Sequence, residues 1–178
     1  SAIDGAKVTL ATGESVAARA VVVATDGPTA SLLLGIPAVE SRKVGCVYFS
    51  ADTPPTQRKL VVLDGTGCGP VLNVAVISNV APSYAPADKH LIVAALPGVI
   101  DGDLEAISRQ QLRSWWGPQV DGWKHLRTYV INHGGPVQKP PFLPKQRVDL
   151  GNGQFVCGDH RDTGSLQGAM YSGRRCGE

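Results

Sequence analysis

The sequence predicts a mixed α/β fold in which a mainly antiparallel sheet carries a covering helix. Three patterns lead to this prediction: a continuous apolar run at 21–25, four successive strand-like segments between residues 44 and 96, and helical periodicity at 101–116. Successive strands joined by short turns favour antiparallel pairing. The 178 residues include 21 glycines and 13 prolines, which is typical of many short strands joined by tight turns.

Residues 1–40 predict a hairpin, a buried strand and a short helix. The elements expected here are strands at 7–10, 15–20 and 21–25, followed by a helix at 29–34. The run Val21-Val22-Val23-Ala24-Thr25 is apolar and β-branched over most of its length, a pattern typical of a strand buried on both faces. Asp26-Gly27-Pro28 ends this strand, and Gly35 ends the helix.

The middle of the chain, residues 41–136, predicts an antiparallel sheet with one well-marked helix. The strands expected here lie at 44–49, 59–64, 71–77, 90–96 and 123–132. A glycine-rich turn at 65–69 separates the second of these strands from the third. In the helix at 101–116, three apolar residues and one glutamine recur every three or four positions and predict one buried face. These residues are Leu104, Ile107, Gln111 and Trp115.

The last part of the chain predicts a proline-rich passage at 136–144, a short buried strand at 155–159 and a helix from about Gly164. Small residues recur on this helix and allow another backbone or a flat ligand to come close. They are Gly168, Ala169, Ser172 and Gly173. Two interpretations stay open here. One is a plain strand–turn–helix capped by Asp162 or Thr163; the other is a ligand site, with an anionic group at the helix N-terminus and Asp159 accepting hydrogen bonds from ligand hydroxyls.

The composition excludes several classes of function. Seventeen Lys and Arg against fifteen Asp and Glu give a net charge of +2, too balanced to favour binding to nucleic acid or an anionic membrane. No apolar run is long enough to span a bilayer. The widely spaced Cys46, Cys68, Cys157 and Cys176 predict buried free thiols in a reducing, intracellular compartment. The four histidines lack metal-site spacing and are expected at the surface or behind other site residues, and no Gly-x-Ser-x-Gly elbow indicates a hydrolase.

The most informative stretch runs from Gly153 to Arg175. Its Gly158-Asp159 pair, followed by Gly164-Ser165-Leu166-Gln167-Gly168-Ala169-Met170-Tyr171-Ser172-Gly173, resembles the C-terminal flavin-contacting motif of the FAD-dependent amine oxidase and phytoene desaturase superfamily. The resemblance implies FAD as the cofactor, with Asp159 near its ribityl and pyrophosphate groups. It also implies that the backbone of Ser165 and Leu166 approaches the polar edge of the isoalloxazine ring. The same implied site includes Gly158, Gly164, Gly168 and Ala169.

Two further segments resemble the same superfamily. Residues 21–26 resemble the strand ending in Ala-Thr that closes the FAD domain, which implies that Ala24 and Thr25 lie close to the cofactor. Residues 123–136, followed by Pro140-Pro141, resemble the segment that returns the chain from the substrate domain. The resemblance therefore implies an FAD-domain part at 1–40, a substrate-domain part at 41–136 and a return to the FAD domain at 137–178.

The resemblance also bounds the expected function. It implies oxidation or desaturation of a lipophilic or amine substrate by hydride transfer to the flavin, and no residue stands out as a catalytic acid or base. Because no Gly-x-Gly-x-x-Gly follows a first strand, the chain is expected to be the C-terminal part of such an enzyme. To bind FAD well, it is expected to need the missing N-terminal half or a protein partner covering the same surface. The alternative is a non-catalytic structural subunit docked on a larger complex, in a chloroplast setting by analogy with plastid desaturases.

Overall fold

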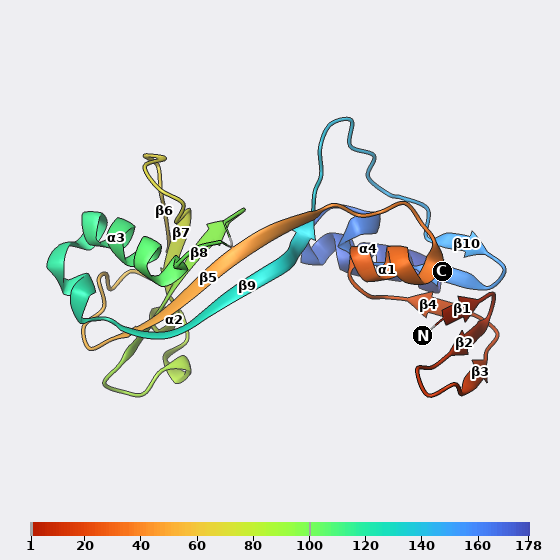
Figure 1. The fold of residues 1–178 in the computed structure, drawn as a ribbon, viewed down its shortest axis with the longest axis horizontal. Helices are drawn as coiled ribbons and strands as arrows, with labels where there is room; N and C mark the ends of the chain where they lie inside the picture. The colour runs from red at the N-terminus through yellow and green to blue at the C-terminus, as the bar shows by residue number, and fades with distance from the viewer. Residues whose placement is uncertain (1, 100) are drawn as a thin grey trace. The chain divides into compact units, whose positions relative to one another are not determined.

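The computed structural model describes residues 2–99 and 101–178 of the chain (Figure 1). Its elements form two compact units, one made of the chain up to Arg42 and from His133 onward, the other of Lys43–Asn132. Both units contain strands and helices, so the predicted mixed α/β class is confirmed. Ser1, the first residue of the predicted segment 1–40, lies outside the described residues.

The first unit begins with a small antiparallel sheet of three strands. These strands are β1 (Ala2–Asp4), β2 (Lys7–Thr9) and β3 (Ser15–Ala17). The predicted hairpin is confirmed, because β2 pairs with β3 in a register that places Lys7 opposite Ala17. β1 was not predicted separately, because its three residues carry too short a pattern to distinguish a strand from a loop.

A second sheet of the first unit brings together strands from both ends of the chain. Its order is β10 (Asp149–Gly151), β11 (Gln154–Val156) and β4 (Val21–Val23). β11 and β4 run parallel, with Val156 opposite Val23, and both side chains pack with Ala30 in a small core. The prediction that the strand at 21–25 is buried on both faces is wrong, because Val22 is 50% exposed. In the described part of the chain β4 lies at the edge of the sheet, and only its Val23 side is covered.

The two α-helices of the first unit begin at polar capping residues. α1 (Gly27–Leu34) begins at Asp26, whose carboxylate accepts a hydrogen bond from the Thr29 amide at 2.8 Å. It starts two residues before the expected position, because Pro28 fits the first turn of a helix. α4 (Leu166–Gly177) begins at Ser165, so the expected caps Asp162 and Thr163 are wrong. The segment expected as a loop before α4 contains a short 3-10 helix, η3 (Asp159–Arg161).

The second unit contains a mainly antiparallel sheet of five strands in the order β6-β7-β8-β5-β9 as described (Figure 1). The bounds are β5 Ser41–Ala51, β6 Val61–Leu63, β7 Asn73–Val76, β8 His90–Pro97 and β9 Lys124–Pro136. Every strand expected between residues 44 and 132 is therefore found. The expected strand at 59–64 is shorter, and those at 44–49 and 123–132 are longer. The glycine-rich turn separates β6 from β7, as predicted.

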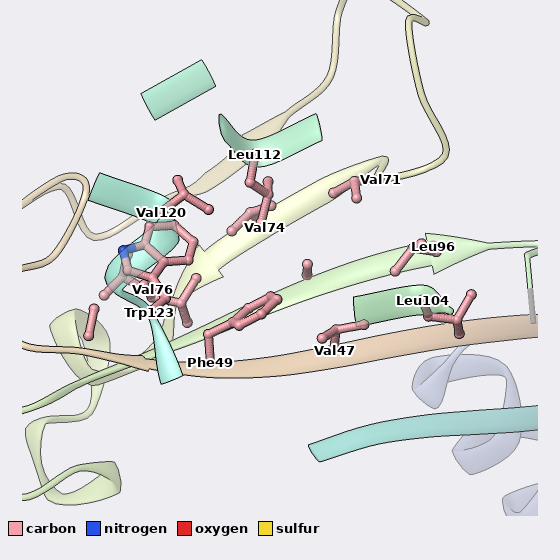
Figure 2. Close-up of a cluster of buried hydrophobic side chains, with 13 residues drawn as sticks. Val47, Phe49, Val71, Val74, Val76, Leu96, Leu104, Leu112, Val120 and Trp123 are labelled. Carbon is pink, nitrogen blue, oxygen red and sulfur yellow. The ribbon is translucent and has the colours of Figure 1, made fainter. Parts of the chain in front are cut away.

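Helix α3 (Leu104–Trp116) covers one face of this sheet (Figure 2). Asp103 caps it by accepting a hydrogen bond from the Ala106 amide at 3.0 Å, and Gly117 ends it. Leu104 and Leu112 are buried against strand residues such as Val47. The helical periodicity read from the sequence is confirmed. Short helices connect the remaining elements: α2 (Ile77–Val80), η1 (Pro82–Tyr84) and η2 (Gly117–Gly122).

The sheet has a second face, opposite the α3-covered core. Because strand side chains alternate, Tyr48 of β5 and its register partner Val93 of β8 point away from the α3-covered core. The ring of Tyr129 on β9 meets Tyr48 edge-on, with 5.5 Å between centroids. At the far strand, Val61 and Leu63 of β6 are exposed. The sheet therefore presents an open face, which we define by these five residues.

No helix among residues 2–99 and 101–178 has the length and apolar character needed to cross a membrane. The four cysteines are free thiols. Cys157 is buried and Cys46 and Cys176 are half-buried, whereas Cys68 is exposed in the turn between β6 and β7. The expectation of buried thiols is wrong for Cys68.

Candidate functional site

The carboxyl ends of β4 and β11 meet at one edge of the sheet, because the two strands are parallel. The Cys157 amide donates to the Val23 carbonyl at 3.0 Å and extends the ladder by one residue beyond both strands. Ala24 and Thr25 follow β4, and Gly158 and Asp159 follow Cys157. Four of the residues that the sequence proposed for cofactor binding are therefore brought to the same edge from opposite ends of the chain.

Gly158 occupies a position that few other residues could fill. Its φ of 147° lies in a region that side-chain-bearing residues avoid. A Cβ atom at this position would also lie 2.6 Å from the His160 ring and 3.4 Å from the Thr25 carbonyl oxygen. The backbone at the strand end is thus held close to both neighbours, and Gly158 itself adds no side chain there.

Ser172 ties this strand end to helix α4. Its hydroxyl accepts a hydrogen bond from the Gly158 amide at 2.9 Å and lies 2.8 Å from the Gly158 carbonyl, to which it can donate. Four residues further along the helix, the Cys176 thiol lies 3.4 Å from the Val156 carbonyl. Because later helix residues meet earlier strand residues, α4 runs antiparallel to β11. Its first turn therefore extends past the carboxyl end of the strand.

The first turn of α4 is closed on one side and open on the other. The Ser165 hydroxyl accepts from the Gly168 amide at 3.0 Å, and a Cβ atom on Gly168 would overlap the Thr163 carbonyl group, 2.8 Å from its carbon. Gly168 thus lets the Thr163 backbone approach, as the small residues on this helix predicted. By contrast, the amides of Leu166 and Gln167 donate no hydrogen bond to any described residue. Two donors and the positive end of the helix dipole remain available.

The remaining candidates lie along the same stretch. A Cβ atom on Gly164 would touch the side chains of Pro136 and Gln138 at 3.4 Å, which explains a small residue there. Ala169 is half-buried on the next turn of α4. Leu166 is 80% exposed, so its side chain packs little on its neighbours. The candidates from Gly158 to Ala169 thus form one continuous strand end, loop and helix start.

Asp159 is half-buried and makes no ion pair or side-chain hydrogen bond with a residue in the described ranges. Arg175 pairs with Asp162 and not with Asp159, with 3.2 Å between the guanidinium and the Asp162 carboxylate. The Asp159 carboxylate therefore keeps its acceptor capacity for a ligand.

Three titratable groups surround this edge. Hydrogen bonds from Thr29 lower the pKa of Asp26, and the charges of His133 and His160 lower it further. Burial lowers the pKa of His160, whose ring is 9% exposed and has no described partner at either nitrogen. The His133 Nδ1 lies 2.7 Å from the Ser41 hydroxyl.

The histidines were expected at the surface or behind other site residues. His160 is not at the surface, because η3 turns its ring back against Gly158. Only its place two residues after Gly158 could have signalled this. No group of three His, Cys, Asp or Glu side chains suited to a metal occurs in the described part of the chain.

Comparison with known families shows which family the chain belongs to. The profile of the family described as flavin containing amine oxidoreductase matches residues 2–177. The chain belongs to this family. The resemblance read from Gly158-Asp159 and the following glycine-rich helix start is thus confirmed at the level of the amine oxidase family. A search among curated proteins found no match.

Solved structures share the fold at low sequence identity. An oxidoreductase from Methanosarcina mazei is 14% identical with a TM-score of 0.57, over 93% of this chain and 44% of that one. A protein from Pyrococcus furiosus is 14% identical with a TM-score of 0.63, over 94% and 42%. A reduced UDP-galactopyranose mutase is 13% identical with a TM-score of 0.67, over 99% and 45%. The chain thus spans less than half the length of these structures.

Proposed function

We propose that this chain supplies the wall of an FAD site that contacts the flavin ring and the ribityl chain, within an oxidoreductase of the amine oxidase type. The parallel register of β4 and β11 carries the proposal, since it brings Thr25 and Gly158 together at the carboxyl ends of both strands, next to Asp159. The open first turn of α4 lies just beyond that edge. Ligands of α/β sheets bind outside the carboxyl ends of parallel strands.

The residues at this edge fit the polar groups of a flavin. The unpaired carboxylate of Asp159 can accept hydrogen bonds from ribityl hydroxyls. The free amides of Leu166 and Gln167 can donate to the carbonyl groups of the ring, with the helix dipole favouring negative charge there. When bound, the flavin supplies the hydride acceptor of the reaction. The chain's own residues hold and orient it, and Gly158 adds no side chain of its own at the strand end.

The nucleotide end of FAD is assigned to another part of the flavoprotein fold. The related solved structures are more than twice as long as the matched region, and the sequence here carries no Gly-x-Gly-x-x-Gly. In the first unit, Val22 on the open edge of β4 and Leu32 on α1 are exposed apolar residues. We assign these residues to contact with that missing half, or with a partner that takes its place.

The substrate class we propose is a lipophilic compound or an amine with an apolar body. The open face of the sheet in the second unit supports this, because Tyr48, Val93 and Tyr129 offer aromatic and aliphatic surface there, with the Arg127 guanidinium 5.0 Å from the centroid of the Tyr129 ring. Anaerobic mixing of the flavin-loaded protein with primary amines and with long-chain polyenes tests the class. Loss of the visible flavin band identifies the compounds that reduce it, and a band unchanged by both series refutes this assignment.

Titration of the purified protein with FAD, FMN and riboflavin, followed by flavin fluorescence, tests the cofactor assignment. We expect Asp159→Ala to weaken binding of all three by about 10- to 100-fold, the effect of losing a charge-assisted hydrogen bond. Asp4→Ala, an exposed carboxylate on β1, is the control and should leave binding unchanged. Equal affinity of the Asp159 variant and the unmodified protein would remove Asp159 from the site.

A second candidate function is a non-catalytic structural subunit that keeps this fold. The exposure of Leu166 and Met170 on α4, 80% and 75%, favours it, since such residues suit a protein contact. Protein that co-purifies with other chains, carries no flavin and binds none when FAD is added would establish this candidate. A chloroplast setting rests on analogy with plastid desaturases, and cell fractionation tests it.

A further inference from the structure

A groove of about 480 Å³ lies within the first unit. Two segments form it, one from Ile36 to Val39 and the other from Pro136 to Leu150, with His160 and Arg161 at one wall. Ile36, Val39 and Leu150 give it apolar sides, and Phe142 contributes an aromatic ring. The volume suits a small organic molecule.

The charged groups of the groove have one sign. Lys139, Arg147 and Arg161 line it, and no carboxylate does. Lys139 is bound to Glu40 at 3.0 Å, and Arg161 donates to the Arg147 carbonyl, so both are engaged. The guanidinium of Arg147 makes no ion pair or hydrogen bond with a described residue. One planar donor group is therefore available at the rim, beside apolar walls.

His160 also lines the groove, and its ring is packed against Gly158. The ring is nine-tenths buried, and both nitrogens are closed off from solvent. It therefore adds packing surface to the groove and no donor within reach of a ligand. Burial and the charge of Arg161 lower the pKa of His160, so the ring adds no positive charge to the groove at pH 7.

We infer that this groove binds a small organic carboxylate with an apolar body, its head group on Arg147 and its body along Ile36, Val39 and Leu150. A guanidinium matches a carboxylate with two parallel hydrogen bonds, whereas the apolar walls exclude a small hydrated anion. The chemistry excludes a cationic amine, because every charged side chain lining the groove is basic. The inference does not depend on the flavin assignment, since these four residues are not part of that proposed site.

Isothermal titration of the purified full chain with decanoate, decanol and decyltrimethylammonium tests the inference. We expect decanoate to bind at least tenfold more tightly than the other two probes. Arg147→Ala should weaken decanoate binding by about tenfold, the loss of one charge-assisted contact. Arg147 is exposed, so its removal does not threaten folding, and thermal unfolding of the variant verifies this. Arg174→Ala is the matched control, because Arg174 is exposed, pairs with Glu178 and lies outside the groove.

A second variant tests the position of the apolar body. Ala38 is exposed and lines the groove, so Ala38→Trp should fill it and abolish decanoate binding without loss of stability. Equal binding of decanoate and decanol would overturn the carboxylate assignment. Decanoate binding that survives both Arg147→Ala and Ala38→Trp, or no decanoate binding by the unmodified chain, would overturn the site.

Discussion

Replacement of Gly168 by alanine should destabilise the protein, although alanine is the better helix former. A Cβ atom at this position would overlap the carbonyl group of Thr163, which is backbone and cannot rotate away. To make room, the loop before α4 must move, and the hydrogen bond from the Gly168 amide to the Ser165 hydroxyl is then lost or weakened. The same change in Gly173, five residues later on the same helix, meets no described atom within 4 Å.

The magnitudes separate the two variants clearly. For Gly168→Ala, overpacking costs about 1–3 kcal/mol and the lost cap about 1 kcal/mol, against a helix-propensity gain of about 1 kcal/mol. Since the overlap is with backbone, we expect the upper part of the resulting range, a loss of about 2–3 kcal/mol. For Gly173→Ala only the propensity term applies, and the free energy of unfolding should rise by about 0.5–1 kcal/mol.

Urea denaturation followed by tryptophan fluorescence measures both free energies, provided that the m-values stay equal. A Gly168→Ala variant as stable as the Gly173→Ala variant would refute the close packing of Thr163 on the first turn of α4. Flavin affinity supplies an independent readout. It should fall in the Gly168 variant, because the amides of Leu166 and Gln167 move with the loop, and it should stay unchanged in the Gly173 variant.

Two further predictions concern buried polar groups. Ser172→Ala leaves the Gly158 amide without its acceptor and should lower the free energy of unfolding by about 1–3 kcal/mol, measured by the same urea titration. A loss below about 0.5 kcal/mol would mean that water replaces the hydroxyl. For His160, burial lowers the folded-state pKa below the ordinary 6.5, so the unfolded chain binds the proton first as the pH falls. Stability present above about pH 6.5 should therefore be lost below it, and His160→Phe should reduce this loss in unfolding experiments across the pH range; an unchanged pH profile would exclude His160 as its source.

The sequence predicted the elements whose signal is local and missed those that depend on their neighbours. The spacing of Leu104, Ile107 and Gln111 is enough to define α3 and its buried face, because a helix repeats within one segment. The apolar run at 21–25 carries the pattern of a central strand, yet Val22 is exposed. Whether a strand is central or at an edge depends on which strands pair with it, and that information lies elsewhere in the chain.

The candidate site shows the same division. Gly158-Asp159 and the helix that follows are contiguous, so a resemblance in sequence could find them. The pairing of β4 with β11 joins segments about 130 residues apart, and no local pattern specifies its register. The roles of Ser165 as cap and of His160 as a buried ring also escaped prediction. Asp162, Thr163 and Ser165 are all good caps, and only the packing of the loop decides among them.

Within this site, the groups that stabilise the fold are distinct from those that are free to bind a ligand. The Ser172 and Ser165 hydroxyls accept hydrogen bonds from the Gly158 and Gly168 amides. Because Gly168 has no side chain, the Thr163 carbonyl can pack against it. Asp159 and the first amides of α4 are left without described partners, although they lie on the same stretch. Mutations of the first group should therefore change stability and flavin affinity together. Mutation of Asp159 should change affinity alone, because an unpaired, half-buried carboxylate contributes no contact to the folded chain.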